Sequence, residues 1–573
     1  MLDSSFAEIS EHFRLLTEVA ILLRTGGREG ESPARPKVIL TQGTVVGIQQ
    51  QDAYPKPVDA FLGIPYALPP TGDRRFRPPE KVAASTDVID ASKFGPRAPA
   101  KLFIVKGPQL EESEDCLTAN VFRQTGTGPP GSKPLPVAIY FHGGAFNRGY
   151  AAQHDSASMV GWSAEPFILV SFNYRLGALG FLPSKLSAKH GALNLGLKDQ
   201  ILLMEWVQGN IGRFGGDKNN VTIFGLSAGA HSIGHHLLDY KEDKPALFHR
   251  AMMESGAPTS RAVRHYDSDI HEEQFKAFLK EVDCPEALPE DGIFPFLRSI
   301  PLSVITKAQT TVFYRYNPSL RWAFQPVIDG EIIHHRPIDG WRDGKWHKVP
   351  IMTGFNGNEG SLYVPKTMSE SSEFTNFFHE LLPQLSQEDL DTIDALYPDP
   401  ATVPDSIYKE DRLSLGVGPQ YKRIEAAYAH YAYVAPVRQT AHFAGPHVPV
   451  YLYHWAAISS VVGGATHGDN MAYEVREKAV CAKSKAQDEL AGVLHAYITS
   501  FICTGDPNKI PGAYGDRPEW VAHRGDGPKK IVFGLGNEEL IGGGVGVPAT
   551  VDDDVWAKKE SDFWWDKVEI SQQ

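Results

Sequence analysis

The sequence predicts an α/β fold in which a large, mostly parallel twisted sheet is covered by helices on both faces. Three observations predict it. Short apolar runs of β-type residues alternate with long helical patterns, the runs are continuously apolar, and a glycine-bounded serine stands where one run meets a helical pattern. Continuous apolarity suits strands that are buried on both faces, as in a parallel sheet with helices on each side.

Five apolar runs are expected to form strands of this sheet: Val137–Phe141, Phe167–Val170, Val221–Phe224, Val349–Met352 and Val450–Tyr453. The segment Gly196–Ile211 is expected to form a covering helix, because its apolar residues recur at helical spacing. The glycine-rich stretches near Gly534 and at Gly542–Gly544 lack the context of a dinucleotide site and are expected to form loops.

The chain of 573 residues is 42% hydrophobic and 22% charged, which is typical of a globular protein with a large core. We expect an N-terminal helix and linker over residues 1–36 and a single domain over 37–573. Apolar residues within Ser4–Leu23 have roughly helical spacing, and Gly26 and Gly27 end that pattern.

The net charge of −13 provides no basic stripe for a nucleic acid or an anionic membrane surface, so neither partner is expected. No apolar stretch approaches the roughly 20 residues that cross a bilayer. Asp3, Glu8 and Glu11 stand where a secretory signal carries positive charge. These features favour a cytoplasmic protein.

Metal and disulfide sites are not expected. The four cysteines lie far apart and are expected to be buried thiols. His231 and His235 have the spacing of metal ligands on a helix, but no acidic partner lies between them. We interpret them as packed, hydrogen-bonded histidines.

The segment Gly225–Gly229 places Ser227 between the run Val221–Phe224 and the helical pattern Ala230–Leu238. A nucleophilic serine on a sharp strand-to-helix turn needs small flanking residues, and the glycines supply them. The following helix would direct backbone N–H groups toward a developing oxyanion. The spacing therefore indicates a serine nucleophile.

The chain resembles the type-B carboxylesterase family, whose relatives include cholinesterases, lipases and non-catalytic adhesion proteins. The resemblance covers about Lys37 to about Phe533. It is carried by the serine turn Gly225–Gly229 and by these motifs: Gly63–Ala67, Arg75–Phe76, Glu114–Leu117, His142–Gly144, Asn173–Arg175, Asn194–Gln200 and Phe214–Asp217. It implies an α/β-hydrolase fold with helical insertions.

The resemblance also implies the remaining site residues. An oxyanion hole would be formed by the backbone N–H groups of Gly144, Ala145 and Ala228. The family segment that carries the acid matches Gly354–Ser361 and points to Glu359, while the family's His-Gly-Asp segment points to His467. The chain order of serine, acid and histidine is that of this fold. Glu359 would orient the imidazole, and His467 would act as the base.

Some departures from the family bear on the substrate. Leu226 replaces the acidic residue that commonly precedes the serine, and Ala145 replaces a glycine and narrows the adjoining space. The loop from Ala98 to Cys116 contains no tryptophan for an ammonium-binding cage. Phe146 and Leu226 are candidate pocket residues and suggest a neutral, fairly hydrophobic ester. We therefore expect a carboxylesterase rather than a cholinesterase.

Many members of the resembled family also have a cysteine near the position of Ala98 that bonds to the equivalent of Cys116. This chain has no such cysteine, and the loss of the bridge favours a reducing compartment.

The favoured function is hydrolysis of a small ester through an acyl-enzyme, which requires no cofactor. Two alternatives remain open. The same residues could transfer the acyl group or open a lactone on a natural product, or the chain could be a non-catalytic recognition protein on the same fold. The sequence leaves the oligomeric state undefined.

Overall fold

The computed structural model describes residues 35–571, except 102–106, 129–130, 262 and 526. The chain divides into two units, Met1–Pro36 and Lys37–Gln573. The helix expected over Ser4–Leu23 lies outside the described residues. All described helices and strands belong to the second unit.

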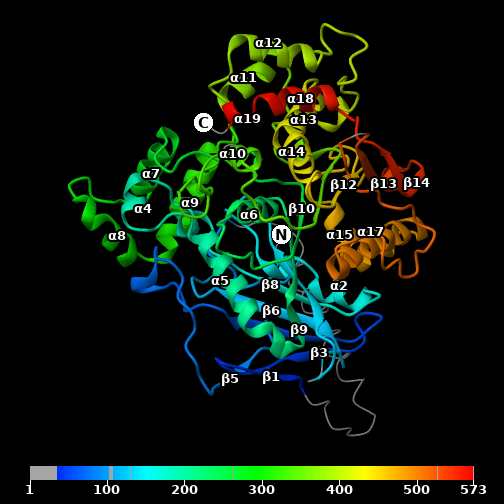
Figure 1. Cartoon of the computed structure of the whole chain (residues 1–573). Helices are drawn as coiled ribbons and strands as arrows, with labels where there is room; N and C mark the ends of the chain where they lie inside the picture. Colours follow the sequence, from blue (N-terminus) through cyan, green and yellow to red (C-terminus); the bar gives the residue numbers. More distant parts are fainter. Residues whose placement is uncertain (1–34, 102–106, 129–130, 262, 526, 572–573) are drawn as a thin grey trace, which may run out of the picture. The chain divides into compact units, whose positions relative to one another are not determined.

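A mixed sheet of eleven strands forms the centre of this unit (Figure 1). Its strands, in spatial order, are β14 (Val545–Asp553), β13 (Lys529–Asn537), β12 (Val450–Trp455), β11 (Ile351–Asn356), β10 (Arg250–Glu254), β9 (Gly216–Leu226), β7 (Leu135–Phe141), β8 (Ile168–Phe172), β6 (Thr118–Gln124), β4 (Val58–Pro65) and β3 (Ile48–Gln50). Pairing is parallel from β13 through β8 and antiparallel at both edges. The predicted α/β fold is confirmed.

A separate small sheet consists of β1 (Lys37–Leu40), β2 (Gly43–Val46) and β5 (Val88–Asp90). Strand β2 pairs antiparallel with β1 and parallel with β5.

Helices cover both faces of the large sheet, and β7 shows why. Val137, Ile139 and Phe141 belong to one apolar cluster, whereas Ala138 and Tyr140 belong to another. Successive side chains of a strand point to opposite faces. The first cluster contains side chains of α5 (Leu195–Asn210) and α6 (Ala228–Leu238), and the second those of α2 (Ser156–Trp162) and α17 (Lys485–Thr504). The helix predicted at Gly196–Ile211 is α5.

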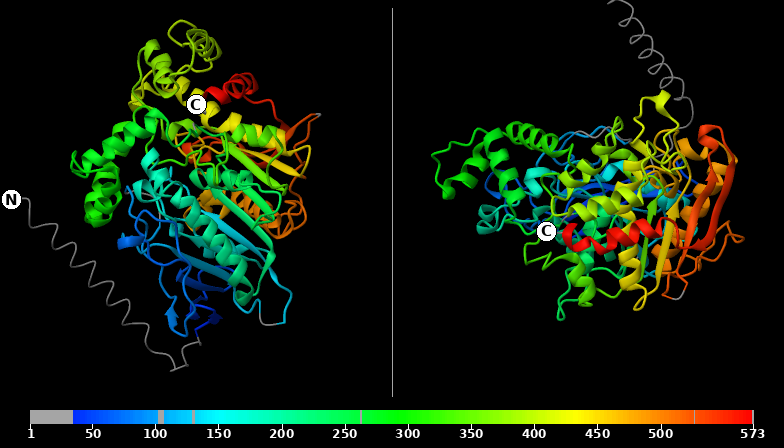
Figure 2. Two further views of the ribbon diagram at one scale, coloured as in Figure 1. Left: turned by 60° about the vertical axis from the view of Figure 1, so that its left-hand side comes forward. Right: turned by 90° about the horizontal axis from the view of Figure 1, so that it is seen from above.

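A helical insertion has its own apolar cluster. It contains residues of α11 (Ser371–Leu381), α12 (Gln387–Leu396), α13 (Tyr421–Ala429) and α18 (Lys558–Asp566), together with Ala145 from the loop after β7. Figure 1 and the left view of Figure 2 show α11, α12 and α18 grouped at the end of the unit opposite β1 and β5. The insertion therefore packs directly against a predicted oxyanion residue.

The remaining α-helices are α3 (Gly177–Gly180), α4 (Lys185–Lys189), α7 (Asp269–Glu281), α8 (Glu290–Ser299), α9 (Leu302–Tyr316), α10 (Pro337–Arg342), α14 (Ala435–Ala444), α15 (Asn470–Glu474), α16 (Lys478–Cys481) and α19 (Val568–Ser571). Short 3₁₀ segments occupy Gly72–Arg74, Ala151–Gln153, Ile211–Phe214, Glu359–Leu362, Leu413–Leu415 and Glu539–Ile541, and His430–Val434 is π-helical.

The C-terminal hairpin differs from the expectation. Gly534 was expected in a loop but lies within β13 at φ 69°, where the register with β14 skips a pair. A glycine can adopt this backbone conformation inside a strand, so the ladder bends there without ending. Gly542–Gly544 do form a loop, and β14 after it is an edge strand that contains Pro548.

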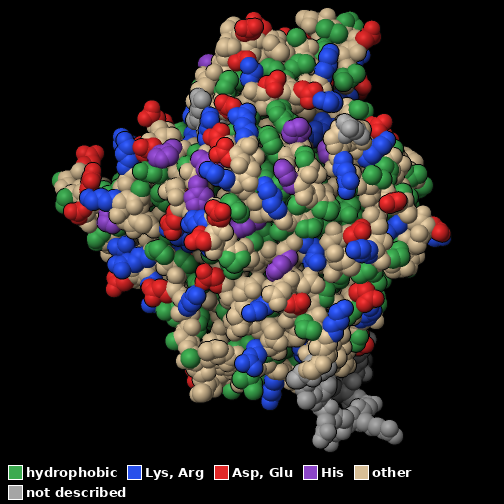
Figure 3. Space-filling view, in the orientation of Figure 1, with side chains coloured by type: hydrophobic (Ala, Val, Ile, Leu, Met, Phe, Trp, Pro, Cys, Tyr) green, Lys and Arg blue, Asp and Glu red, His purple; other side chains and the backbone are tan. Residues whose placement is uncertain are grey.

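Figure 3 shows Lys and Arg side chains interspersed with Asp and Glu over one face of the molecule. Among the described helices, none combines the length and apolarity needed to cross a membrane. All four cysteines are free thiols; Cys116 is buried and the other three are partly buried.

Candidate active site

Ser227 occupies the turn between β9 and α6. Its backbone has φ 58° and ψ −121°, a conformation that residues other than glycine rarely adopt. The Ser227 N–H donates to the Glu254 carbonyl at the end of β10 over 2.9 Å, which fastens the turn to the neighbouring strand. The serine is 4% exposed. The predicted sharp turn between strand and helix, called the elbow here, is present in the structure.

The two glycines of the elbow allow β7 to pack tightly beneath it. A Cβ on Gly225 would lie 2.3 Å from the Phe141 carbonyl oxygen, and one on Gly229 would lie 2.0 Å from the same oxygen. Both distances are far shorter than a van der Waals contact. The close approach brings the end of β7, and the loop that follows it, next to Ser227.

The loop after β7 is held by hydrogen bonds to its carbonyl groups. His142 Nδ1 lies 2.9 Å from the Gly143 carbonyl, and the Asn147 N–H donates to the Gly144 carbonyl over 3.1 Å. These bonds fix the two peptide planes that carry the N–H groups of Gly144 and Ala145. The amides of Asn147 and Gln325 each donate to the Ala145 carbonyl over 2.9 Å.

The backbone N–H groups of Gly144, Ala145 and Ala228 donate no hydrogen bond to another described residue. Two of these groups come from the fixed loop, and the third begins α6. The backbone of Ala145 has φ 55°, a value that is unusual for a residue with a side chain. Preset donors of this kind are suited to an oxyanion.

Glu359 and His467 form a buried pair. Glu359 Oε2 lies 2.5 Å from His467 Nδ1, and Oε1 accepts the Asn356 N–H over 2.7 Å. The Glu359 side chain is 0% exposed and that of His467 is 5% exposed. Both carboxylate oxygens therefore have a donor, as a buried carboxylate requires.

Hydrogen bonds of side chains and backbone join the loops that follow β11 and β12. Asn356 Nδ2 donates to the Thr466 carbonyl over 2.7 Å. Asn358 donates its N–H to the Ala465 carbonyl over 2.9 Å and accepts the Ala465 N–H on Oδ1 over 3.0 Å. These bonds to Ala465 and Thr466, next to His467, therefore fix the position of the histidine relative to β11.

The outer nitrogen of the imidazole remains available. His467 Nε2 is buried and forms no hydrogen bond to any described residue, Ser227 included. Catalytic hydrogen bonds are often long before substrate binds. The rings of Tyr363 and Tyr433 pack on the imidazole, with centroids 5.3 and 4.8 Å away. Sequence reasoning missed both tyrosines, because no motif marks them.

The candidate pocket residues lie in different surroundings. Leu226 is half-buried, and its side chain approaches Gly468, next to His467. Phe146 is 2% exposed and lies in the core, its ring centroid 5.0 Å from that of Phe181. Leu226 thus lies next to His467, whereas Phe146 packs in the core and does not face the candidate site as a pocket wall would.

His231 and His235 are buried on α6. Nδ1 of His231 lies 3.1 Å from the Ala257 carbonyl. Burial lowers the pKa of His235 to about 4 and that of His231 well below its usual range, so both rings are neutral at pH 7. No three His, Cys, Asp or Glu side chains of the described part are grouped to hold a metal ion.

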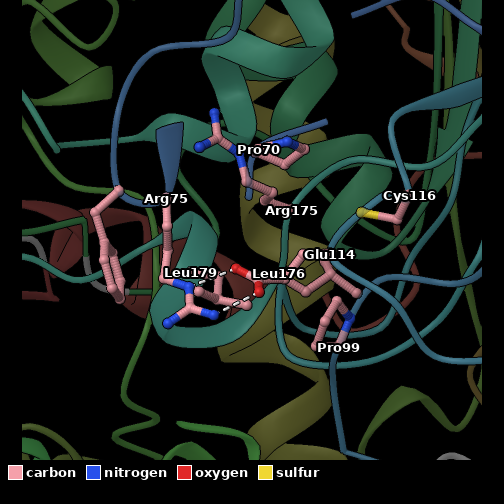
Figure 4. Close-up of a pocket in the computed structure, with 9 residues that line it drawn as sticks. Pro70, Arg75, Pro99, Glu114, Cys116, Arg175, Leu176 and Leu179 are labelled. Carbon is pink, nitrogen blue, oxygen red and sulfur yellow. Dashed lines mark hydrogen bonds and ion pairs between the residues drawn. The ribbon is translucent and has the colours of Figure 1, made fainter. Parts of the chain in front are cut away.

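The family motifs outside the elbow have structural positions. Figure 4 shows Arg75 and Glu114 joined by an ion pair in a pocket that Cys116 and Arg175 also line. The Arg75–Glu114 distance is 2.6 Å. Arg175 forms a second buried pair with Asp199, also at 2.6 Å. These pairs connect separate segments of the core, so the motifs preserve the fold around the site.

The sheet topology, the helices on both faces and the serine turn after β9 define an α/β hydrolase. Residues 34–536 match the model of the carboxylesterase family. The chain belongs to this family and is a carboxylic ester hydrolase.

Three relatives illustrate the likeness. The chain is 37% identical to secreted lipase 4 of Gibberella zeae over 519 residues, which are 89% of this chain and 88% of the relative. It is 30% identical to the secreted triacylglycerol lipase LIP1 of the same fungus, over 86% and 85% of the two chains. A crystal structure of Aspergillus niger EstA matches with a TM-score of 0.80 and 25% identity, covering 94% of this chain and 99% of that one.

The expected cytoplasmic location is wrong, because two of these relatives are named as secreted. The expectation depended partly on the missing cysteine at Ala98. Ala98 is 1% exposed, and it packs with the fully buried Cys116 in the main apolar cluster. Apolar packing at this position takes the place of a bridge, so a free Cys116 says little about the redox compartment.

Proposed function

We propose that Ser227 is the nucleophile, His467 the base and Glu359 the supporting acid of a serine esterase. One observation carries the proposal. A fully buried carboxylate lies 2.5 Å from an imidazole whose other nitrogen is unpaired, and the pair is on loops that follow β11 and β12, two and three strands from the elbow strand β9. A hydrolase of this fold needs such a pair at this edge of its sheet.

In the proposed reaction, His467 Nε2 removes the hydroxyl proton of Ser227 while the serine oxygen attacks the ester carbonyl. The proton then passes to the leaving alcohol, and an acyl-enzyme remains. Water, deprotonated by the same nitrogen, releases the acid. Glu359 keeps the Nδ1 proton in place, so that Nε2 is the free base.

The N–H groups of Gly144, Ala145 and Ala228 would stabilise the oxyanion in both steps. Each lacks a protein acceptor among the described residues, so a substrate oxygen displaces no existing hydrogen bond. Removing one donor of this kind typically costs about 10²–10³ in turnover.

The surroundings favour a neutral, fairly hydrophobic ester. Leu226, Tyr363 and Tyr433 place apolar surface beside the serine and histidine. The names of the relatives, secreted lipases and a triacylglycerol lipase, agree with an apolar acyl chain and with action outside the cell. No observation favours acyl transfer or a non-catalytic role.

The proposal is tested with a series of p-nitrophenyl esters of increasing acyl length, using wild type and Ser227→Ala. We expect a pre-steady-state burst in the wild type and a loss of about 10⁴-fold or more in the variant. Ser372→Ala, at an exposed serine of α11, is the matched control and should keep wild-type turnover. Equal rates in wild type and folded Ser227→Ala would refute the nucleophile.

A further inference from the structure

A cavity of about 40 Å³ has an unusually cationic wall. Three arginines, Arg261, Arg264 and Arg321, line it together with His271, and no Asp or Glu is among its lining residues. A cavity needs roughly 10–15 Å³ by this measure to hold one water molecule. The space is therefore large enough for a small polar group of a few atoms.

Arg261 has buried hydrogen-bond donors without an acceptor among the described residues. Its guanidinium lies 4.2 Å from the centre of the Trp322 ring and donates from Nη2 to the Tyr433 hydroxyl over 2.6 Å. Its Nε and Nη1 are buried and form no hydrogen bond within the described part of the chain. Buried donors of a permanent cation are costly when unpaired, so a ligand that accepts them is favoured.

Other cavity-lining groups share this property. Nε of Arg321 and both ring nitrogens of His271 are buried without a hydrogen bond to a described residue. Burial, and then the charge of Arg264 and Arg321, lowers the pKa of His271 to about 3. His271 is thus neutral at pH 7, and the positive charge at the cavity comes from its three lining arginines.

Two contacts connect the cavity to the active centre. Tyr433, whose hydroxyl accepts the hydrogen bond from Arg261, packs its ring on His467, with ring centroids 4.8 Å apart. Gln325 lines the cavity and also donates to the Ala145 carbonyl over 2.9 Å. Tyr433 thus contacts both a cavity-lining arginine and the imidazole, and Gln325 links the cavity to the loop that carries Ala145.

We propose that this cavity is a carboxylate-binding subsite of the active centre. A guanidinium fork matches the two oxygens of a carboxylate, and the unpaired donors of Arg261 and Arg321 are suited to such a planar acceptor. The inference rests on the proposed esterase function. The neutral, hydrophobic surroundings described above concern the ester group that reacts. The carboxylate can belong to a second, acidic group of the same substrate, remote from that ester group, or to a free acid such as the one that hydrolysis releases.

Binding is measured first, by calorimetric titration of sodium butyrate into wild type, Arg321→Gln and Arg321→Lys in buffers matched for sodium chloride. We expect Arg321→Gln to weaken binding about 10- to 100-fold, the range for hydrogen bonds to a charged group, and Arg321→Lys to weaken it less. Arg315→Gln, at an exposed ion pair with Glu281, should bind butyrate like the wild type. Thermal melts identify variants that fold.

A second measurement distinguishes the sources. Hydrolysis of monomethyl adipate and methyl hexanoate is compared by pH-stat. A preference for the acidic ester that falls in Arg321→Gln assigns the site to the substrate. Inhibition by butyrate that falls in the same variant, without that preference, assigns it to a free acid. Butyrate binding that is absent, or equal in all folded variants, would overturn the subsite.

Failure of the esterase proposal has a different signature, since ester hydrolysis would then persist in Ser227→Ala whatever the butyrate titration shows.

Discussion

Ser227 and His467, the proposed nucleophile and base, are held in place by different means. Ser227 is positioned by backbone packing. Because Gly225 and Gly229 have no Cβ, the elbow packs so close to the Phe141 carbonyl that a methyl group would not fit between them. His467 is positioned by side-chain hydrogen bonds, from Glu359 directly and from neighbouring amides indirectly. The first arrangement tolerates no added atom, whereas the second can be weakened stepwise.

The largest effect is expected where His467, the proposed base, loses the carboxylate beside it. Glu359→Gln retains an oxygen for the Asn356 N–H, but its amide group can present N–H toward His467 Nδ1 and favour the wrong tautomer. We expect kcat to fall about 10³- to 10⁴-fold at nearly unchanged KM. Steady-state kinetics on a short p-nitrophenyl ester measure this.

Glu359→Asp serves as the comparison for this variant, since it keeps the charge at a greater distance and should lose less. If kcat of folded Glu359→Gln stays close to the wild-type value, Glu359 is not the partner of the base.

The backbone arrangement is broken by Gly229→Ala. The added Cβ would meet the Phe141 carbonyl at 2.0 Å, so the elbow or β7 must move. Overpacking of a tight core typically costs 1–3 kcal/mol or more, and we expect a loss near or above the top of that range. The denaturant midpoint reports it, together with residual esterase activity.

Gly209→Ala is the matched control for this prediction. Gly209 lies within α5, and a Cβ there meets nothing within 4 Å. Alanine replaces glycine in a helix with a gain of roughly 0.5–1 kcal/mol. Equal midpoints for the two variants would contradict the packing argument.

The smallest expected effect concerns Glu425, which belongs to the hydrogen-bonded surroundings of His467. Glu425 accepts a hydrogen bond from Asn358, and burial raises the pKa of its carboxyl to about 7. The folded protein therefore binds this proton more tightly than the unfolded chain, and the stabilisation is lost as the pH rises toward 7. The contribution is on the order of 2 kcal/mol between pH 5 and 8.

Glu425→Gln should remove this pH dependence, because the amide oxygen still accepts from Asn358 but carries no proton to lose. Denaturant midpoints at pH 5 and pH 8 provide the test. The exposed Glu380→Gln is the control, and its midpoints should follow those of the wild type. A Glu425→Gln protein with the same pH slope as the wild type would refute the assignment.

Local sequence signals sufficed for much of the fold. The run Val221–Phe224, the glycines beside Ser227 and the apolar face of Gly196–Ile211 each predict an element that the structure contains. They succeed because strand burial, turn geometry and helical spacing depend on neighbouring residues. The pairing of Glu359 with His467 required the family resemblance, since 108 residues separate them along the chain.

The arginine cavity could not be predicted in this way. Arg261, Arg321 and His271 come from separate segments, and an arginine by itself is most often a surface residue. Tyr433 likewise lies in a different segment, the π-helical turn His430–Val434, and contacts His467 only in the folded protein. Such contacts arise from the packing of distant segments, for which no local pattern exists.

The edge strand β14 has a consequence for how these molecules meet one another. Pro548 removes one N–H donor from the last strand, and Asp552 and Asp553 add exposed charge near its end. Edges of this kind are poor templates for a strand from a second chain. Crowded molecules are therefore hindered from joining through this edge of the eleven-stranded sheet into larger aggregates.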